Sequence, residues 1–331
     1  MPSPTYELAH CIVCGHANAR VVAERDDLRA EVEWLWAFHA RRLKTDTPIR
    51  ALVDRVAFSE YPPFRLVECV GCGLVYRNPM EREREVVAVY SETHTPRDVL
   101  QALHDNQLPL ARRQAHDLRG VLGHGGTGLE LGSYVGSFLA AAREHDLIVD
   151  GVDINACVNA FTRGLGFVVH DGTLTDLDDD RRLDLVAIWN TFDQLADPRA
   201  ALLGTAKLLR PDGVLAIRVP NGAFYAARRH ASQQHGRLRQ AAARAVLAQN
   251  NLLGFPYRWG FTVDSATRLL ESFGFTVVRA VGDTLPRTSD RWTRPWARLE
   301  ERAVKSWMSA GLRRNPRRAP WIELYARPST R

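Results

Sequence analysis

The sequence predicts an α/β protein in which a doubly wound, mostly parallel sheet of seven strands follows a small metal-binding module. From residue 127 onward, short apolar runs alternate with helical stretches, which is typical of strands joined by helical crossovers. Two CxxC pairs lie in the first 80 residues. The chain has 331 residues, of which 45% are hydrophobic and 25% charged, enough for about two domains with full cores.

The paired cysteines indicate a metal site formed by Cys11, Cys14, Cys69 and Cys72. A spacing of two residues lets both sulfurs of a pair face one tetrahedral ion, and the glycine after each pair relieves the tight turn. The pairs are farther apart than the usual roughly 15–20 residues, and a helix expected over Asp27–Leu43 explains the excess as an insertion. Four thiolates leave no open position, so a Zn²⁺ ion here is expected to be structural. The alternative is two sets of free thiols.

Helical patterns continue from Glu81 to about Leu122, with Pro96 and Pro109 as expected interruptions. We therefore expect a zinc-binding module with a helical insert over residues 1–80, a helical lead-in over 81–125 and the α/β domain over 126–331. The strands of that domain are expected at Gly128–Gly132, Ile148–Ile154, Phe167–His170, Leu183–Trp189, Val214–Val219, Phe275–Val281 and Trp321–Ala326. The helices are expected at Gly136–His145, Asn155–Arg163, Pro198–Leu209 and Asp264–Phe273.

The loop after the first strand is the predicted ligand-binding turn. Gly123–Gly128 matches the literal GxGxxG pattern, but it precedes the strand, whereas the fingerprint must follow a strand and open a helix. The segment Glu130–Phe138 does meet this requirement. Gly132 can adopt a backbone conformation closed to other residues, and the helix beginning near Gly136 offers amide groups to a polar ligand. Two glycines instead of three disfavour a dinucleotide and suit a ligand with an amino-acid end.

Asp153 ends the second strand, 21 residues after Gly132. An acidic side chain about 20 residues past the loop holds a pair of ribose hydroxyls in folds of this kind. The alternative is that Asp153 caps the helix that follows it.

Several segments together resemble the class I S-adenosylmethionine-dependent methyltransferases: Leu129–Phe138, Gly151–Asp153, Asp184–Pro198 and Leu209–Gly213. More narrowly, the chain resembles the bacterial branch that carries a CxxC…CxxC zinc-binding module before a Rossmann-like, seven-stranded class I methyltransferase sheet. The resemblance implies an enzyme that uses S-adenosyl-L-methionine as its cofactor. Tyr134 departs from the family pattern, which often has glycine there, and its side chain is expected to shape one wall of the pocket.

The resemblance also implies a set of cofactor-binding residues. Glu130 and the loop residues Gly132, Ser133, Tyr134 and Gly136 would hold the methionine part, and Asp153 would hold the ribose. Ile154 would pack on the adenine ring, and the turn containing Gly172, Thr173 and Leu174 would read its edge. Asn190 would lie beside the amino-acid end of the cofactor, and Tyr90 would close over it.

The catalytic base is the least determined part of the prediction. In the related branch the segment after the fourth strand often reads Glu-His-Leu, and its histidine is a candidate base; here the segment reads Asp193-Gln194-Leu195. Asp193 is therefore one candidate. His230 and His235 are two others, since they lie in Pro220–Gly260, the position of a substrate cap in this family (about residues 221–260), and imidazole titrates near neutrality. The alternative is that both are surface histidines in an Arg-rich helix.

The distribution of charge indicates the substrate class. The formal net charge is +6, and the segment Ala223–Gln249 has five arginines and no acidic residue. Because arginine binds oxyanions bidentately, we expect an anionic small-molecule substrate, methylated on O, N or C in natural-product or sugar biosynthesis. Nucleic acid is disfavoured as a partner because no aromatic-interleaved basic stripe is present.

Two other functions remain open: an RNA-binding or RNA-modifying zinc protein, and a methyltransferase-like scaffold without transfer activity. The N-terminus has no signal-peptide pattern, and no run approaches the roughly 20 apolar residues of a membrane span. We therefore expect a cytoplasmic protein with no membrane partner. The acceptor atom, the oligomeric state and the role of the Arg-rich tail stay open.

Overall fold

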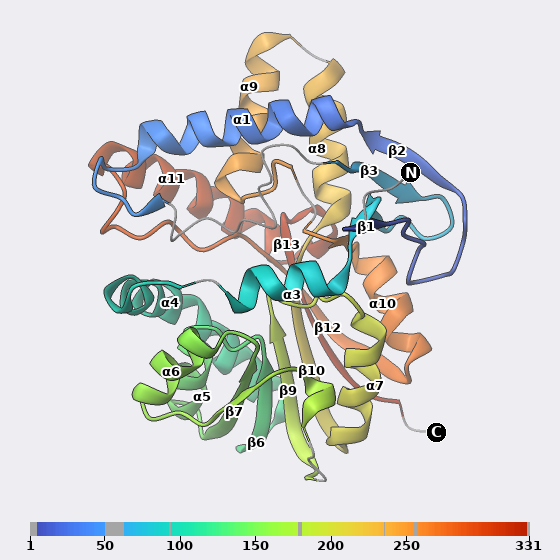
Figure 1. The fold of residues 1–331 in the computed structure, drawn as a ribbon, viewed down its shortest axis with the longest axis vertical. Helices are drawn as coiled ribbons and strands as arrows, with labels where there is room; N and C mark the ends of the chain where they lie inside the picture. The colour runs from blue at the N-terminus through green and yellow to red at the C-terminus, as the bar shows by residue number, and fades with distance from the viewer. Residues whose placement is uncertain are drawn as a thin grey trace. The chain divides into compact units, whose positions relative to one another are not determined.

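The computed structural model describes residues 5–49, 63–92, 94–177, 181–234, 236–254 and 257–329 (Figure 1). The chain divides into two compact units, each assembled from segments that are distant in sequence. Unit 1 comprises Met1–Val86, Val219–Arg268 and Val281–Ile322, and unit 2 comprises Val87–Arg218, Leu269–Ala280 and Glu323–Arg331. The domain boundaries expected at residues 80 and 125 stay a prediction.

Unit 2 contains most of a seven-stranded sheet with the spatial order β12-β13-β10-β9-β6-β7-β8. Strands β6 to β10 are parallel to their neighbours along the series β10, β9, β6, β7 and β8. The strands are β6 (Gly126–Leu131), β7 (Leu147–Asp153), β8 (Val169–Asp171), β9 (Leu183–Trp189), β10 (Leu209–Pro220), β12 (Phe275–Asp283) and β13 (Trp321–Pro328). Each predicted strand has its counterpart, which confirms the expected class I sheet.

Helices cover both faces of this sheet. α4, α5 and α6 lie on one side and α7 on the other (Figure 1). Two helices, α3 (Glu83–Ser91) and α10 (Val263–Ser272), begin in unit 1 and end in unit 2. The other helical elements of unit 2 are α4 (Arg97–Leu122), α5 (Ser137–Arg143), α6 (Ala156–Gly164), the 3-10 turn η1 (Leu174–Asp176) and α7 (Pro198–Leu208). All seven residues of β9 are buried, as expected for a parallel strand covered on both faces.

Local sequence signals explain several helix ends in unit 2. The side chain of Asn155 caps α6 by accepting the amide of Val158 at 3.0 Å, and Asp197 caps α7 immediately before Pro198. The expected interruption at Pro109 is wrong, since α4 continues through it. A long helix with buried residues before and after the proline tolerates the loss of one backbone hydrogen bond.

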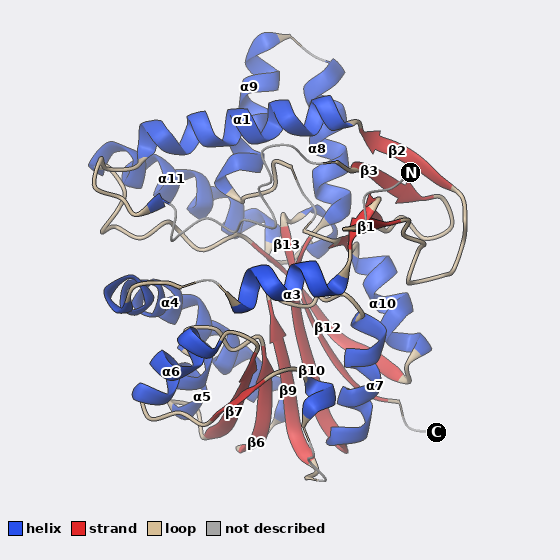
Figure 2. Cartoon of the chain, viewed as in Figure 1, coloured by secondary structure: helices blue, strands red, loops and turns tan. Residues whose placement is uncertain are grey.

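Unit 1 combines helices with small antiparallel sheets (Figure 2). One sheet has the order β11-β4-β3-β2, and β1 pairs with β5. The strands are β1 (Tyr6–Glu7), β2 (Ala19–Ala23), β3 (Arg65–Cys69), β4 (Val75–Asn78), β5 (Met80–Glu81) and β11 (Trp259–Gly260). The helices are α1 (Arg25–Arg42), α8 (Gly222–Gln234), α9 (Arg237–Gln249), α11 (Pro295–Leu312) and the 3-10 turn η2 (Pro316–Arg318). The insertion helix expected at Asp27–Leu43 is thus confirmed as α1.

The segment expected to form a substrate cap shares a hydrophobic core with the cysteine-bearing N-terminal segment. Leu28 and Leu35 of α1 pack in one buried cluster with Phe224 of α8 and Leu247 of α9. Met308 of α11 belongs to the same cluster. Helices α8 and α9 are therefore held by residues more than 180 positions away in sequence.

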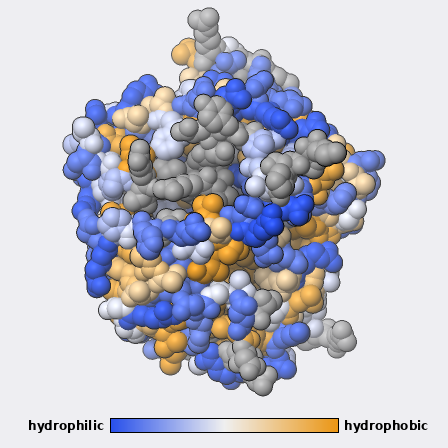
Figure 3. All heavy atoms as spheres, viewed as in Figure 1, coloured by the Kyte–Doolittle hydropathy of each residue, from blue (hydrophilic) through white to orange (hydrophobic). Residues whose placement is uncertain are grey.

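The described helices include none with the length and hydrophobicity needed to cross a membrane. On the face drawn in Figure 3, hydrophobic residues form small groups among hydrophilic ones.

Candidate functional site

The loop between β6 and α5 has a backbone that few side chains tolerate. Gly132, Tyr134 and Gly136 have φ angles of 75°, 43° and 69°. A Cβ atom added to Gly132 would lie 2.1 Å from Oγ1 of Thr191, and one added to Gly136 would lie 2.6 Å from Cγ2 of Thr162. Both glycines are thus required by the backbone conformation and by the lack of space.

Two carboxylates flank this loop. The carboxylate of Asp153, at the end of β7, accepts the amide N–H of Tyr134 at 3.0 Å and that of Asn155 at 2.9 Å, which joins the loop to the start of α6. Burial raises the pKa of Asp153, and these backbone hydrogen bonds oppose the rise. Burial also raises the pKa of Glu130 well above its usual range, and the nearby Asp153 raises it further. Glu130 is 4% exposed, so its carboxylate is costly to ionise without a cationic partner.

The ends of β8 and β9 contribute the other predicted cofactor residues. Gly172 has a φ of 113° and donates its amide to the carbonyl of Asp153 at 3.0 Å. Thr173 is the N-cap residue of η1, and Leu174 is buried. Asn190 follows β9 in a left-handed conformation with φ 58°, and the side chain of Arg218 donates to its Oδ1 atom.

Tyr90, near the end of α3, is hydrogen-bonded to the segments that follow β9 and β7. Its hydroxyl donates to Oε1 of Gln194 at 2.8 Å, and its carbonyl accepts Nδ2 of Asn155 at 2.6 Å. Gln194 in turn donates Nε2 to the carbonyl of Asn190 at 2.6 Å. The sequence does not predict the contributions of Gln194 and Asn155; the only signal for Gln194 is its place in Asp193-Gln194-Leu195, where the resemblance leads one to expect a histidine.

These residues fit a ligand with a cationic amino-acid end and a ribose. Oε2 of Glu130 and Oγ of Ser133 are buried, and neither has a hydrogen-bond partner within the described part of the chain. A buried polar atom without a partner is costly, and a ligand that supplies donors removes the cost. The close approach at Gly132 keeps side chains out of the same turn.

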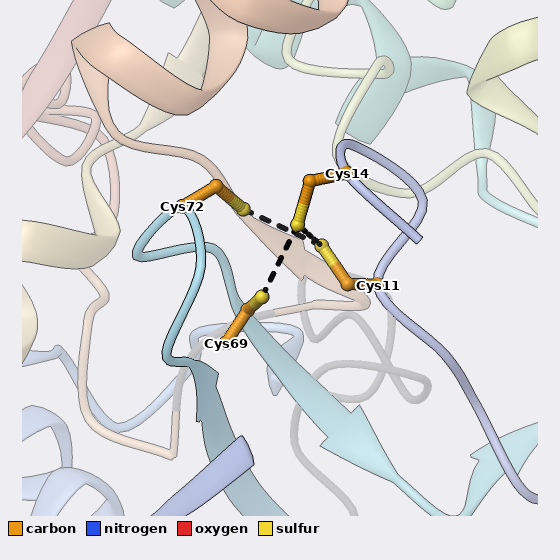
Figure 4. A group of neighbouring side chains, drawn as sticks. All are labelled: Cys11, Cys14, Cys69 and Cys72. Atoms are coloured by element: carbon orange, nitrogen blue, oxygen red, sulfur yellow. Dashed lines mark hydrogen bonds between the residues drawn. The ribbon is translucent and has the colours of Figure 1, made fainter. Parts of the chain in front are cut away.

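The four predicted metal ligands lie together in unit 1 (Figure 4). All four sulfurs lie within 4.8 Å of one another, and Cys11–Cys72, Cys14–Cys69 and Cys11–Cys14 are separated by 3.4, 3.5 and 3.6 Å. Both pairs form the same turn, in which the following glycine donates its amide to the carbonyl of the first cysteine: Gly15 to Cys11 at 3.0 Å and Gly73 to Cys69 at 2.9 Å. This donor set and spacing fit a tetrahedral Zn²⁺ ion, for which Zn–S distances are about 2.3 Å.

The described candidate catalytic residues, Asp193 and His230, lie in different units. Asp193 is completely buried in the turn after β9 in unit 2. His230 is exposed on α8 in unit 1. His235 lies outside the described residues.

Arginines of the expected cap have different environments. Arg228, Arg239 and Arg244 are exposed, whereas Arg229 is buried. Arg229 forms ion pairs with Asp27, at 2.8 Å, and with Glu31 of α1. Arg229 is therefore committed to a structural contact. A cavity of about 160 Å³ beside this contact is lined by Asp27, Ala30, Glu31, Arg229, Gln233, Gln240, Arg244, Leu247 and Leu253.

Arg258 is 2% exposed, and its Nε and Nη1 atoms have no hydrogen-bond partner in the described structure. Burial lowers its pKa, and the attraction of Glu81 opposes this effect only in part. Glu81 itself pairs with the buried Arg77 at 3.0 Å. Glu81 is thus paired with one buried guanidinium group and lies close enough to a second to attract it, as Glu7 and Glu83 also do.

Residues 102–280 match the family model described as a methyltransferase domain. No curated protein matches the chain.

Solved structures give distant likenesses. An S-adenosylmethionine-dependent methyltransferase from Thermotoga maritima is 16% identical, in an alignment that covers 66% of this chain and 92% of the Thermotoga chain, with a TM-score of 0.43. The 1,6-didemethyltoxoflavin-N1-methyltransferase of Burkholderia thailandensis, solved with its substrate and S-adenosylhomocysteine, is 18% identical, with coverages of 81% and 96% and a TM-score of 0.44. The methyltransferase CcbJ of Streptomyces caelestis is 16% identical, with coverages of 74% and 96% and a TM-score of 0.43.

Proposed function

The chain belongs to the methyltransferase-domain family and is an S-adenosylmethionine-dependent methyltransferase, and on this premise we propose that it methylates an anionic small molecule. The cofactor supplies the activated methyl group. The residues of the chain bind the cofactor, align the acceptor with it and exclude water.

For the cofactor, we propose that Glu130 and the Gly132–Gly136 loop hold the methionine part. The buried, unpartnered oxygen of Glu130 supports this role, because a protonated amine beside it would stabilise the ionised carboxylate. Asp153, at the end of the adjacent strand, would hold the ribose. Its carboxylate oxygens accept backbone amides, among them those of Tyr134 and Asn155, and a carboxylate has about four acceptor positions in all. Ile154 and the Gly172–Leu174 turn would border the adenine.

The observation that carries the proposed substrate class is the environment of Arg258. Its guanidinium is buried with two nitrogen atoms unpartnered, and the acidic neighbour with the largest effect on it, Glu81, already pairs with the buried Arg77. Such a group is strongly stabilised by an oxyanion, which accepts two N–H groups at once. A carboxylate or phosphate on the acceptor has the required chemistry. Arg229, by contrast, does not support the proposal, since Asp27 and Glu31 already neutralise it.

The test is a panel of acceptors in matched pairs: carboxylates with their methyl esters, and sugar phosphates or nucleotide-linked sugars with the corresponding free sugars. Release of S-adenosylhomocysteine reports transfer. We expect turnover with anionic members and little with their neutral partners. The variant Arg258→Met should raise the acceptor KM by roughly tenfold to a hundredfold, the range for a lost hydrogen bond to a charged group.

Arg239→Met is the matched control, because Arg239 is an exposed arginine of the same expected cap. It should leave the acceptor KM unchanged, and both variants should bind S-adenosylhomocysteine like the native protein. A neutral acceptor that outperforms its anionic partner would reject the proposed substrate class while leaving the methyltransferase activity in place.

We further propose that Cys11, Cys14, Cys69 and Cys72 bind one Zn²⁺ ion with a structural role. The convergence of four sulfurs from two equivalent turns supports this assignment. Four thiolates leave no open position for a substrate or water, so no catalytic step is assigned to the ion.

A further inference from the structure

Gln194, in the turn after β9, makes side-chain hydrogen bonds that its sequence context does not predict. Strands β9 and β7 are the two neighbours of β6 in the sheet. Parallel strands end at the same edge, so the residues after β9 and β7 flank the cofactor loop that follows β6. Gln194 follows β9, and Asn155 follows β7.

Tyr90 joins these two sides. Its hydroxyl is bonded to Gln194 at 2.8 Å and its carbonyl to Asn155 at 2.6 Å, so the end of α3 is fastened at two points that flank the loop. Asn155 is itself rigid, because its amide donates to Asp153 and its Oδ1 caps α6. The hydroxyl and the backbone carbonyl of Tyr90 therefore both hold the end of α3 at this edge of the sheet.

Gln194 is anchored equally well on the other side. Its Nε2 donates to the carbonyl of Asn190 at 2.6 Å, and its amide donates to the carbonyl of Thr191 at 2.8 Å. Asn190 is held in its left-handed conformation by Arg218, whose carbonyl accepts the Asn190 amide at 3.0 Å and whose side chain donates to Oδ1. Arg218 is completely buried. A neutral amide suits this position, because it accepts from Tyr90 and donates to Asn190 simultaneously.

We propose that Gln194 is a positioning residue that fastens Tyr90, and with it the end of α3, over the bound cofactor, rather than a replacement for a catalytic base. A primary amide does not titrate in the physiological range, so Gln194 takes no proton from the acceptor. Gln194 affects methyl transfer indirectly, because it holds Tyr90 and thereby lengthens the residence time of the cofactor. This inference rests on the cofactor position proposed above.

The experiment measures dissociation of S-adenosylhomocysteine from the full chain by stopped-flow fluorescence, for Gln194→Leu, Tyr90→Phe and the double variant. Each single variant loses the Tyr90–Gln194 hydrogen bond, and we expect dissociation to accelerate about threefold to tenfold. The double variant should be no faster than the faster single variant, because both substitutions remove the same contact. Hydrogen exchange of amides in Glu83–Ser91 should rise in both single variants.

Gln101→Leu is the control, since Gln101 is exposed on α4 and bonds only locally to Asp105 at 2.9 Å. It should leave dissociation and exchange unchanged. Additive effects of the two substitutions, or native dissociation rates in both, would overturn the proposed role of Gln194. Failure of the native protein to bind S-adenosylhomocysteine would instead overturn the cofactor site itself, so the two failures are distinguishable.

Discussion

At the scale of single residues, the raised pKa of the buried Glu130 is expected to couple cofactor binding to pH. Its folded-state pKa is raised by burial and by Asp153, whereas a glutamate in an unfolded chain titrates near about 4.3. Because the folded pKa is the higher one, this group stabilises the fold fully below about pH 4.3, and the contribution is lost as pH rises through the folded pKa. A cationic cofactor amine favours the ionised form and thereby opposes the loss.

We therefore expect S-adenosylhomocysteine to bind more tightly as pH rises through the raised pKa of Glu130, with release of a proton from its carboxyl group. Titration calorimetry in two buffers with different ionisation enthalpies measures that proton. Glu130→Gln should reduce the proton release and weaken binding by tenfold or more, since a charged hydrogen bond is lost. Glu144→Gln, an exposed substitution beside the end of α5, should do neither. Equal proton release from the native protein and Glu130→Gln would contradict this role.

Individual residues of the site differ in how far the sequence predicts them. The loop glycines and Asp153 are predictable, because their roles depend on local backbone geometry and a fixed spacing after a strand. The Tyr90–Gln194 hydrogen bond is not, since it joins positions 104 residues apart and neither residue type signals its partner. The alternative that Asp153 caps the helix after it is wrong, because Asn155 supplies the side-chain cap of α6 and Asp153 accepts the Asn155 amide. Its role toward the ribose stays a prediction.

At the scale of elements, we expect the proposed zinc ion to join the two cysteine turns and stabilise them together. They bring together residues on either side of the α1 insertion, and β3 ends at Cys69. Binding a metal to a site absent in the unfolded chain adds its binding free energy to that of folding.

We expect one zinc ion per chain by elemental analysis, and we expect a chelator to lower the thermal unfolding midpoint by several degrees. Cys69→Ser should lose the ion and show the same lowered midpoint without chelator. Cys157→Ser should keep the ion, because Cys157 lies on α6 and outside the cluster. A native protein that contains no metal and is indifferent to chelation would mean that the four residues are free thiols.

Elements of the sheet follow closely from the sequence, because buried parallel strands are short apolar runs separated by helical periods. β9 agrees with the prediction at both ends, and α1 begins and ends within two residues of it. α4 shows the limit of local signals, since Pro109 lies inside it. Burial of residues on both sides of a proline is a property of tertiary packing, and one sequence does not reveal it.

At the scale of the whole molecule, unit 1 is assembled from three segments that are distant in sequence. Its core contains Leu28, Leu35 and Phe64 from the N-terminal segment together with apolar residues of α8, α9 and α11. Glu31 reinforces the same contact, because it accepts the hydroxyl of Tyr225 and pairs with Arg229. Such contacts join distant positions through complementary shapes and charges, which one sequence does not reveal.

Because the core of unit 1 is shared, we expect removal of the N-terminal segment to destabilise the rest of unit 1. A chain that lacks residues 1–86 loses every partner that the N-terminal segment gives to Phe224, Leu247 and Leu253. Uncovering each large apolar side chain costs about 1.5–3 kcal/mol, and several such losses rival the whole stability of a typical domain, about 5–15 kcal/mol. We therefore expect residues 87–331 to aggregate in size-exclusion chromatography and to bind a hydrophobic dye, while the full chain does neither. A monomeric truncated chain that binds S-adenosylhomocysteine with native affinity would show that α8 and α9 fold without the cysteine-bearing segment.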